Sequence, residues 1–165
     1  MTEEAFVKMT DRIRSRRALA FFINVMDKLI TMIVFLAYPM LLGYLYYTKS
    51  PFLVPAFAVP GVSFFLVTLF RRSYNAKRPY EIYDFDPVIK KNTIGKSFPS
   101  RHVFSIFIIA MTFMQIDVIL GAWFLVAGAL LAALRVFGGV HFIKDVIVGA
   151  AAGILAGCIG YYLIF

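Results

Sequence analysis

The chain contains two histidines, and both stand among residues that suit phosphate chemistry. His102 follows a Pro-Ser-Arg tripeptide at the start of an apolar stretch, and His141 stands four residues before Asp145. A neutral imidazole attacks phosphorus as a nucleophile, and a protonated imidazole donates a proton to a leaving oxygen. The two histidines therefore predict a site in which these two roles are divided between them.

Cationic donors are needed beside these histidines, because phosphate oxygens are anionic. Arg71 and Arg78 precede His102 along the chain, and Arg135 lies six residues before His141. A single arginine near the end of an apolar helix is usually an anchor at the membrane interface. The order and spacing of the whole set, rather than any one residue, indicate a phosphate site.

Two local features would orient the reacting groups. Ser100 is a good N-cap for an apolar helix, which would direct its hydroxyl and the N–H groups of Arg101 and His102 at an anion. Asp145 would share one helical face with His141 at i, i+4 spacing, near the start of the last apolar helix. Its carboxylate would accept the proton on one ring nitrogen and raise the nucleophilicity of the other.

The elements that must position these residues are apolar helices. The 165 residues are 61% hydrophobic, with a mean hydropathy of +0.82. A soluble all-helical core is disfavoured, because apolar runs this long leave little polar surface to face water. We predict an all-α integral membrane helical bundle of about five transmembrane helices, the third being the shortest. The stretches without Asp, Glu, Lys or Arg are Leu29–Thr48, Ser50–Phe70, Val103–Ile116, Val118–Leu134 and Val146–Phe165.

Residues 1–165 are predicted to form a single membrane-embedded domain. Within residues 1–28, several Lys and Arg residues accompany Phe6, Met9 and Ile13, which recur at helical spacing. This pattern predicts a basic amphipathic helix that lies in the membrane interface, the alternative being a solvated tail.

The loops over 71–102 and 135–145 are the predicted active-site segments. Five crossings place both loops and the N-terminus on one membrane face, which carries all of the 17 Lys and Arg residues except Lys49. The last helix, over 146–165, is rich in Gly and Ala. Small residues allow close approach of helix backbones, so we expect this helix at the centre of the bundle.

In order and spacing, these motifs resemble the signature of the type 2 phosphatidic acid phosphatase superfamily of integral membrane lipid phosphatases. That signature has three parts: Lys-x6-Arg-Pro, Pro-Ser-Gly-His and Ser-Arg-x5-His-x3-Asp. The resemblance covers about residues 28–160. The matching segments are Arg71-x6-Arg78-Pro79, Pro99-Ser100-Arg101-His102 and Leu134-Arg135-x5-His141-x3-Asp145.

The resemblance implies a reaction through a phosphohistidine, with no metal and no cofactor. His141 would be the nucleophile, Asp145 its orienting partner and His102 the acid that protonates the leaving group. The single cysteine, Cys158, excludes a Cys-rich metal site. By the same resemblance, the phosphoryl oxygens would be held by Arg71, Arg78, Ser100 and Arg135.

Three residues depart from the family pattern. Arg71 replaces a lysine and keeps its charge with a different geometry, and Leu134 replaces a serine. Arg101 replaces a glycine and places a bulky cation beside the phosphate, which suits a diphosphate or a lipid headgroup. Arg101 and the nearby Lys77 are therefore candidate substrate contacts. The chain also has fewer crossings than the six of familiar members.

The predicted activity is hydrolysis of a membrane lipid phosphate or diphosphate. Polyprenyl diphosphates such as undecaprenyl diphosphate, phosphatidate and phosphatidylglycerophosphate all fit. A phosphoryl or headgroup transferase and a non-catalytic lipid-phosphate-binding membrane protein are the alternatives. The expected partners are the lipid bilayer and its lipids. Nucleic acid is not expected despite the net charge of +8, because the cations lie at the membrane face or in the motifs. The oligomeric state stays open.

The predicted location is a bacterial cell membrane, and two arguments disagree about the face. The excess of cations places the site in the cytoplasm, whereas familiar members present it outside the cell or in a lumen. The stretch Tyr80–Phe98 mixes aromatic residues and lysines, which suits the headgroup layer. We interpret it as a lid over the site or as a plain interfacial loop.

Overall fold

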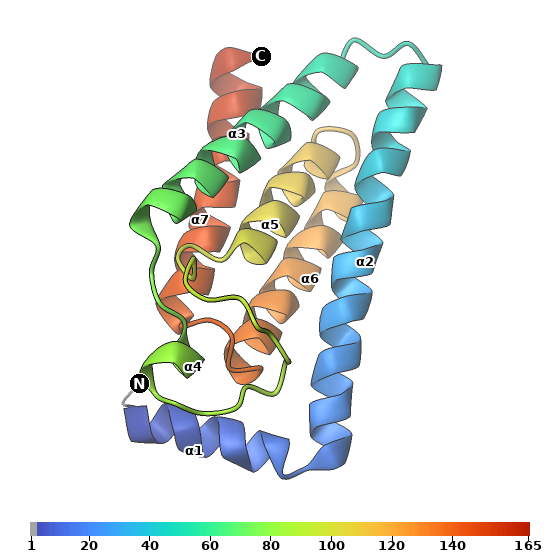
Figure 1. The fold of residues 1–165 in the computed structure, drawn as a ribbon. Coiled ribbons are helices and arrows are strands. Elements are labelled where there is room, and N and C mark those ends of the chain that lie inside the picture. Colours follow the sequence, from blue (N-terminus) through green and yellow to red (C-terminus); the bar gives the residue numbers. More distant parts are fainter. Residues whose placement is uncertain (1–2) are drawn as a thin grey trace.

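The computed structural model describes residues 3–165 and contains helices and loops (Figure 1). The predicted all-α architecture is confirmed. The helices are α1 (Glu3–Arg14), α2 (Arg17–Tyr47), α3 (Leu53–Tyr74), α4 (Pro79–Ile82), α5 (Arg101–Met114), α6 (Val118–Phe137) and α7 (Ile143–Ile159), which continues into a π-helical turn, η1 (Gly160–Ile164).

Among residues 3–165, four helices are long and apolar enough to cross a membrane: α2, α3, α6 and α7 with its π-helical turn. The prediction of five transmembrane helices was wrong in this respect. The exception is α5, which has only 14 residues. At 1.5 Å per residue it is about 21 Å long, short of the roughly 30 Å hydrocarbon core. Helix α5 ends at Met114. Asp117 then caps α6 by accepting a hydrogen bond of 2.8 Å from the Leu120 N–H.

Helix α5 occupies the centre of the bundle, between α3, α6 and α7 (Figure 1). Nearly every side chain from Val103 to Phe113 is buried. The expectation that α7 would be central was therefore wrong, because its outer face exposes Ile147 and Leu155. Its small residues do allow the predicted close approach. A Cβ on Gly153 would lie 2.8 Å from the backbone oxygen of Phe104, on α5.

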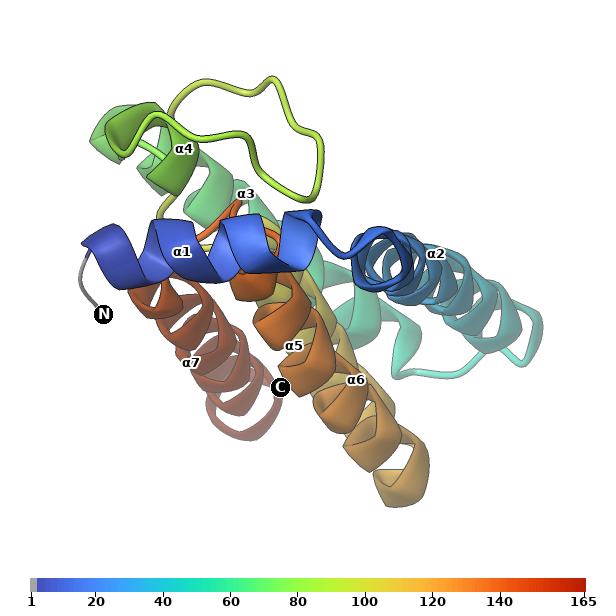
Figure 2. The ribbon, with the colours of Figure 1, turned by 90° about the horizontal axis from the view of Figure 1, so that it is seen from below.

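Helix α1 lies across one end of the bundle, at a large angle to the other helices (Figure 2). It is amphipathic, as predicted, and it buries Phe6 against the rings of Phe85 and Phe142, with centroids 5.8 and 5.9 Å apart. The single helix predicted over residues 1–28 was wrong in extent. Arg16 leaves helical geometry and turns the chain, so that residues 17–28 form the first turns of α2.

The segments that carry the motifs meet at this same end of the bundle. Helices α2 and α3 form a hairpin, with the turn at residues 48–52. Helix α3 continues through Pro60 and returns the chain, and the long loop after it passes over the ends of the other helices (Figure 1). Because α5 still reverses the chain direction despite its length, the loop before α7 arrives there too.

Candidate active site

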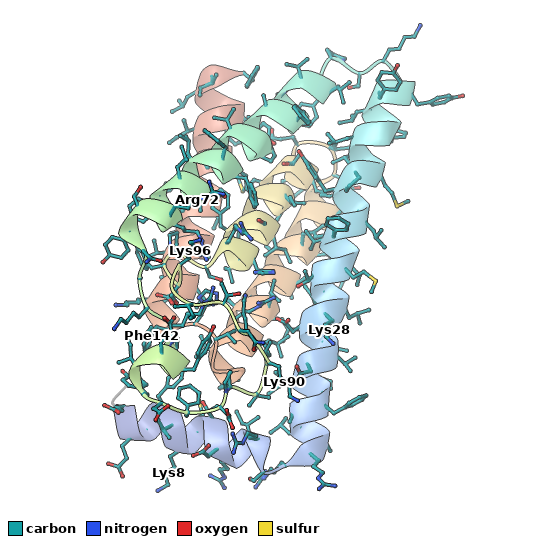
Figure 3. All side chains as sticks on the ribbon, viewed as in Figure 1. Lys8, Lys28, Arg72, Lys90, Lys96 and Phe142 are labelled. Carbon is teal, nitrogen blue, oxygen red and sulfur yellow. The ribbon has the colours of Figure 1, made fainter. Side chains whose placement is uncertain are left out.

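A cavity of about 230 Å³ lies where the end of α3, the long loop, the first turn of α5 and the loop before α7 meet. Both histidines line it, together with several cations. Figure 3 labels two of these, Arg72 on α3 and Lys96 on the loop. The lining residues are Thr68, Arg71, Arg72, Arg78, Lys91, Thr93, Lys96, Arg101, His102 and His141.

His141 is held at its Nδ1 atom by two buried oxygens. Nδ1 lies 3.3 Å from Asp145 Oδ2 and 3.3 Å from Ser97 Oγ. The Ser97 hydroxyl also donates a hydrogen bond to the same carboxylate oxygen. A carboxylate only accepts, so this arrangement places the ring proton on Nδ1 and leaves the lone pair on Nε2. The imidazole is thus oriented as a nucleophile would be.

The contact between His141 and Asp145 does not use one helical face, as the sequence had suggested. Helix α7 begins at Ile143, so His141 precedes it, and Asp145 is the third helical residue. The same carboxylate accepts a hydrogen bond of 3.1 Å from the Phe142 N–H. Asp145 therefore links the first turn of α7 to the ring of His141, which lies outside the helix.

The environment keeps His141 neutral. Burial, with the positive charges of Arg78 and Lys91, lowers the pKa of His141 to about 4, and the hydrogen bond that the ring donates to Asp145 acts in the opposite direction. The ring therefore retains its lone pair at neutral pH. This is the protonation state that nucleophilic attack on phosphorus requires.

Arg71 and Arg78 are both buried, and both hold the loop that leads into α5. Arg71 donates to the backbone oxygens of Lys96, Ser97 and Pro99. Arg78 donates from Nε to the Gly95 oxygen at 3.0 Å, and its terminal nitrogens reach two further backbone oxygens. A guanidinium has five N–H donors, so each arginine keeps two for a ligand in the cavity.

Ser100 stands at the N-cap position of α5, but its side chain does not cap the helix. The residue is fully buried, and its Oγ has no hydrogen-bond partner among residues 3–165. Its backbone N–H donates instead to the backbone carbonyl oxygen of Asp145 at 2.8 Å, which ties α5 to α7. A buried hydroxyl without a partner is costly. Ser100 is not among the residues that line the cavity, so its predicted contact with a phosphoryl oxygen stays a prediction.

Arg135 does not line the cavity. Its buried side chain faces α2, and its Nε lies 2.7 Å from Asp27 Oδ1, close enough for an ion pair but not aligned as a hydrogen bond. Sequence reasoning missed Asp27 because it began the first span at Leu29, just after this carboxylate. A charge inside a spanning helix was the signal that could have revealed it.

Lys91, on the long loop, was also missed as a site residue. It lines the cavity beside the histidines. Burial, together with the positive charges of Arg78, Arg135 and Arg71, lowers the pKa of Lys91 to about 7. The amine therefore changes charge near neutral pH. Lys77, in contrast, is exposed and is not among the residues that line the cavity.

A second cavity, of about 460 Å³, adjoins the first between α2, α3 and α5. Its walls are almost entirely apolar, with side chains such as Val34, Phe57 and Ile109. Arg101 and His102 line both cavities, so the two lie side by side at the first turn of α5. The guanidinium of Arg101 lies over the Phe64 ring, 5.4 Å from its centroid.

The comparison with known protein families agrees with this geometry. The model of the PAP2 superfamily matches residues 51–165, which is well over half of the chain. The chain belongs to the PAP2 superfamily. It is therefore an integral membrane lipid phosphatase of that superfamily.

Two solved structures resemble this PAP2 phosphatase. LpxE of Aquifex aeolicus has 26% sequence identity and a TM-score of 0.67, with 87% of this chain and 92% of that chain covered. A PAP2-type phosphatidylglycerolphosphate phosphatase of Bacillus subtilis has 20% identity and a TM-score of 0.72, with 95% and 83% covered. The second likeness concerns the fold alone. No curated protein sequence matches significantly.

Proposed function

We propose that this PAP2 phosphatase hydrolyses a lipid phosphate or diphosphate through a phosphohistidine on His141. The observation that carries the proposal is that two cavities of opposite character lie side by side at the first turn of α5. One is small and cationic and contains both histidines, and the other is larger and apolar. A lipid with a phosphorylated head fits both at once, because its tail occupies the apolar cavity and its phosphoryl group reaches the cations.

The first half of the reaction transfers the phosphoryl group to the enzyme. The lone pair on His141 Nε2 attacks phosphorus and forms an N–P bond while the bond to the leaving oxygen breaks. His102 donates a proton to that oxygen, which departs as an alcohol or as a lipid monophosphate. Burial and the charges of Arg135 and Lys91 lower the pKa of His102, so the negative charge of the bound phosphoryl group must keep this ring protonated. Asp145 stabilises the positive charge that the His141 ring acquires.

The second half regenerates the enzyme. His102, now neutral, takes a proton from a water molecule, and the water oxygen attacks the phosphorus. The N–P bond breaks, and its electron pair returns to Nε2. Inorganic phosphate leaves, and both histidines return to their starting states. Arg71 and Arg78 stabilise the charge on the phosphoryl oxygens in both steps.

The position of Arg101 favours a diphosphate substrate. Because this residue lines both cavities, it lies beside the group that joins the tail to the transferred phosphoryl. In a polyprenyl diphosphate that group is a second phosphate, which a guanidinium binds well. In phosphatidate it is a neutral glycerol ester, and in phosphatidylglycerophosphate it is a neutral glycerol that separates the two phosphates. We therefore favour a polyprenyl diphosphate over phosphatidate and phosphatidylglycerophosphate.

The proposal is tested by phosphate release from the detergent-solubilised protein with these three lipids. Native protein is expected to release phosphate fastest from the diphosphate. His141→Ala is expected to lower the rate at least about a thousandfold, because no other group can form the phosphoenzyme. Acid quenching with a substrate labelled at its terminal phosphorus should trap label on native protein only. Equal rates for native protein and the variant would disprove the proposal.

A further inference from the structure

We propose that Asp27, on helix α2, is a positioning residue that holds the guanidinium of Arg135 in place for the phosphoryl group. The inference rests on the proposed function, since it assigns a role within the same site. It extends that site to α2, which lies outside the matched family region of residues 51–165. No residue of the three motifs stands on α2.

The pairing of Asp27 with Arg135 is close and buried. The side chains are 8% and 5% exposed, and Oδ1 lies 2.7 Å from Nε. A carboxylate within a spanning helix is costly and is usually kept for a function, with an identifiable partner. Removing one member of such a buried pair leaves the other charge uncompensated. Loss of either charge should therefore disturb the other side chain.

Arg135 does not line the cavity, but it lies close enough to His102 and Lys91, which do, for its charge to lower the pKa of both. Asp27 contacts Nε, at the inner end of the guanidinium, so the two terminal nitrogens are left for a ligand. The backbone of Arg135 is fixed separately, because its oxygen accepts a hydrogen bond of 3.2 Å from the Val140 N–H. The Val140 oxygen accepts in turn from Arg78, at 3.1 Å. Asp27 therefore decides where the side chain points and not where its helix lies.

A neighbouring contact separates this role from general packing of α2. Asn24, one helical turn before Asp27, donates to the Val88 oxygen at 2.9 Å and so fixes the long loop to α2. The next loop residue, Ile89, donates to the Gly138 oxygen at the end of α6, at 3.1 Å. These contacts hold the backbone of the loop without Asp27, although the charges of Asp27 and Lys91 attract each other. A change at Asp27 should thus disturb Arg135 and leave the loop in place.

The test compares Asp27→Asn with native protein in detergent. The readouts are kcat/KM for the lipid substrate and the inhibition constant of inorganic phosphate, which reports phosphate binding without turnover. We expect kcat/KM to fall, and the inhibition constant to rise, about ten- to a hundredfold, the loss expected when one charged hydrogen bond between Arg135 and the phosphate is disturbed. Asp27→Glu should recover part of the loss. Lys28→Gln removes an exposed charge from the same turn of α2 and should change neither value.

The decisive measurement is a double-mutant cycle with Arg135→Gln. If Asp27 acts through Arg135, Asp27→Asn has little further effect on kcat/KM once the arginine is gone. The double variant carries no unpaired charge, so it should keep the stability that Asp27→Asn alone loses. Equal losses in both backgrounds, or an unchanged inhibition constant in folded Asp27→Asn, would overturn the inference. A native protein with no more activity than His141→Ala would instead defeat the proposed function.

Discussion

At the scale of single residues, the site depends on how burial and charge set protonation. His141 is neutral because burial and two cations lower its pKa, while Asp145 and Ser97 hold its ring. Lys91 stands in the same cavity with a pKa of about 7. The site therefore combines a nucleophile that is ready at neutral pH with a cation whose charge varies there.

Lys91 gives a pH dependence that can be measured. Its pKa is lowered, so it carries its charge below about pH 7 and loses it above. Binding of a phosphate anion should therefore weaken as the pH rises from 6 to 8. In Lys91→Gln this part of the dependence should disappear, and phosphate should inhibit several-fold less at pH 6. The measurement is the inhibition constant of inorganic phosphate against pH, in which titration of the phosphate itself is common to all variants.

Lys90→Gln is the matched control, because Lys90 is the exposed neighbour and does not line the cavity. It should keep the native pH dependence. Identical curves for native protein and Lys91→Gln would show that the amine does not contact the bound anion.

At the scale of elements, the site depends on the close packing of α7 on α5. The first turn of α5 carries His102, and the first turn of α7 carries Asp145. Ser100 joins the two helices, because its backbone N–H donates a hydrogen bond to the backbone carbonyl oxygen of Asp145. Along the same contact, Gly149, Gly153 and Gly157 allow the two backbones to approach. A change in this contact would shift one half of the site relative to the other.

Gly153→Ala tests this packing away from the catalytic groups. The new Cβ would meet the Phe104 oxygen at 2.8 Å and the Phe107 Cβ at 2.9 Å, and backbone cannot move aside easily. We expect a loss of about 1–3 kcal/mol in unfolding free energy, the usual cost of overpacking. Thermal unfolding in detergent measures it. Gly43→Ala, where no atom lies within 4 Å, should cost nothing, and similar effects at both positions would refute the close contact.

At the scale of the whole molecule, the cations concentrate at one end of the bundle. Helix α1, the long loop and the site lie at that end, and Lys49 lies in the turn at the other (Figures 1 and 3). Cytoplasmic loops carry an excess of Lys and Arg. This asymmetry predicts that the site faces the cytoplasm, although familiar members present it outside.

Labelling of single cysteines decides the orientation. In a Cys158→Ser background, Lys49→Cys should react with an impermeant maleimide added to intact cells, whereas Lys8→Cys should react only after the membrane is opened. Lys8 is exposed on α1 and is labelled in Figure 3. The reverse pattern would show that the charge rule fails for this chain and that the site faces outward.

Much of the arrangement was readable from residue types and spacing. Apolar runs bounded by charges predicted the helices, because a membrane core excludes ionisable groups. Gln115 and Asp117 also show why the count was wrong, since they end α5 before it is long enough to cross. Histidine and arginine spacing predicted which segments would meet, and both histidines do line one cavity.

What only the tertiary structure decided is which group each site residue contacts. Sequence spacing cannot show that Asp27 faces Arg135 or that Ser97 reaches Asp145, because these contacts join segments remote in the chain. It also cannot show that Arg71 and Arg78 spend several donors on the loop before α5. Local sequence patterns determine helices, because helix formation depends on interactions between residues close in the chain. The partner of a buried polar group is decided only by the tertiary structure, because packing removes water and the group must then bond to whichever residues the fold places beside it.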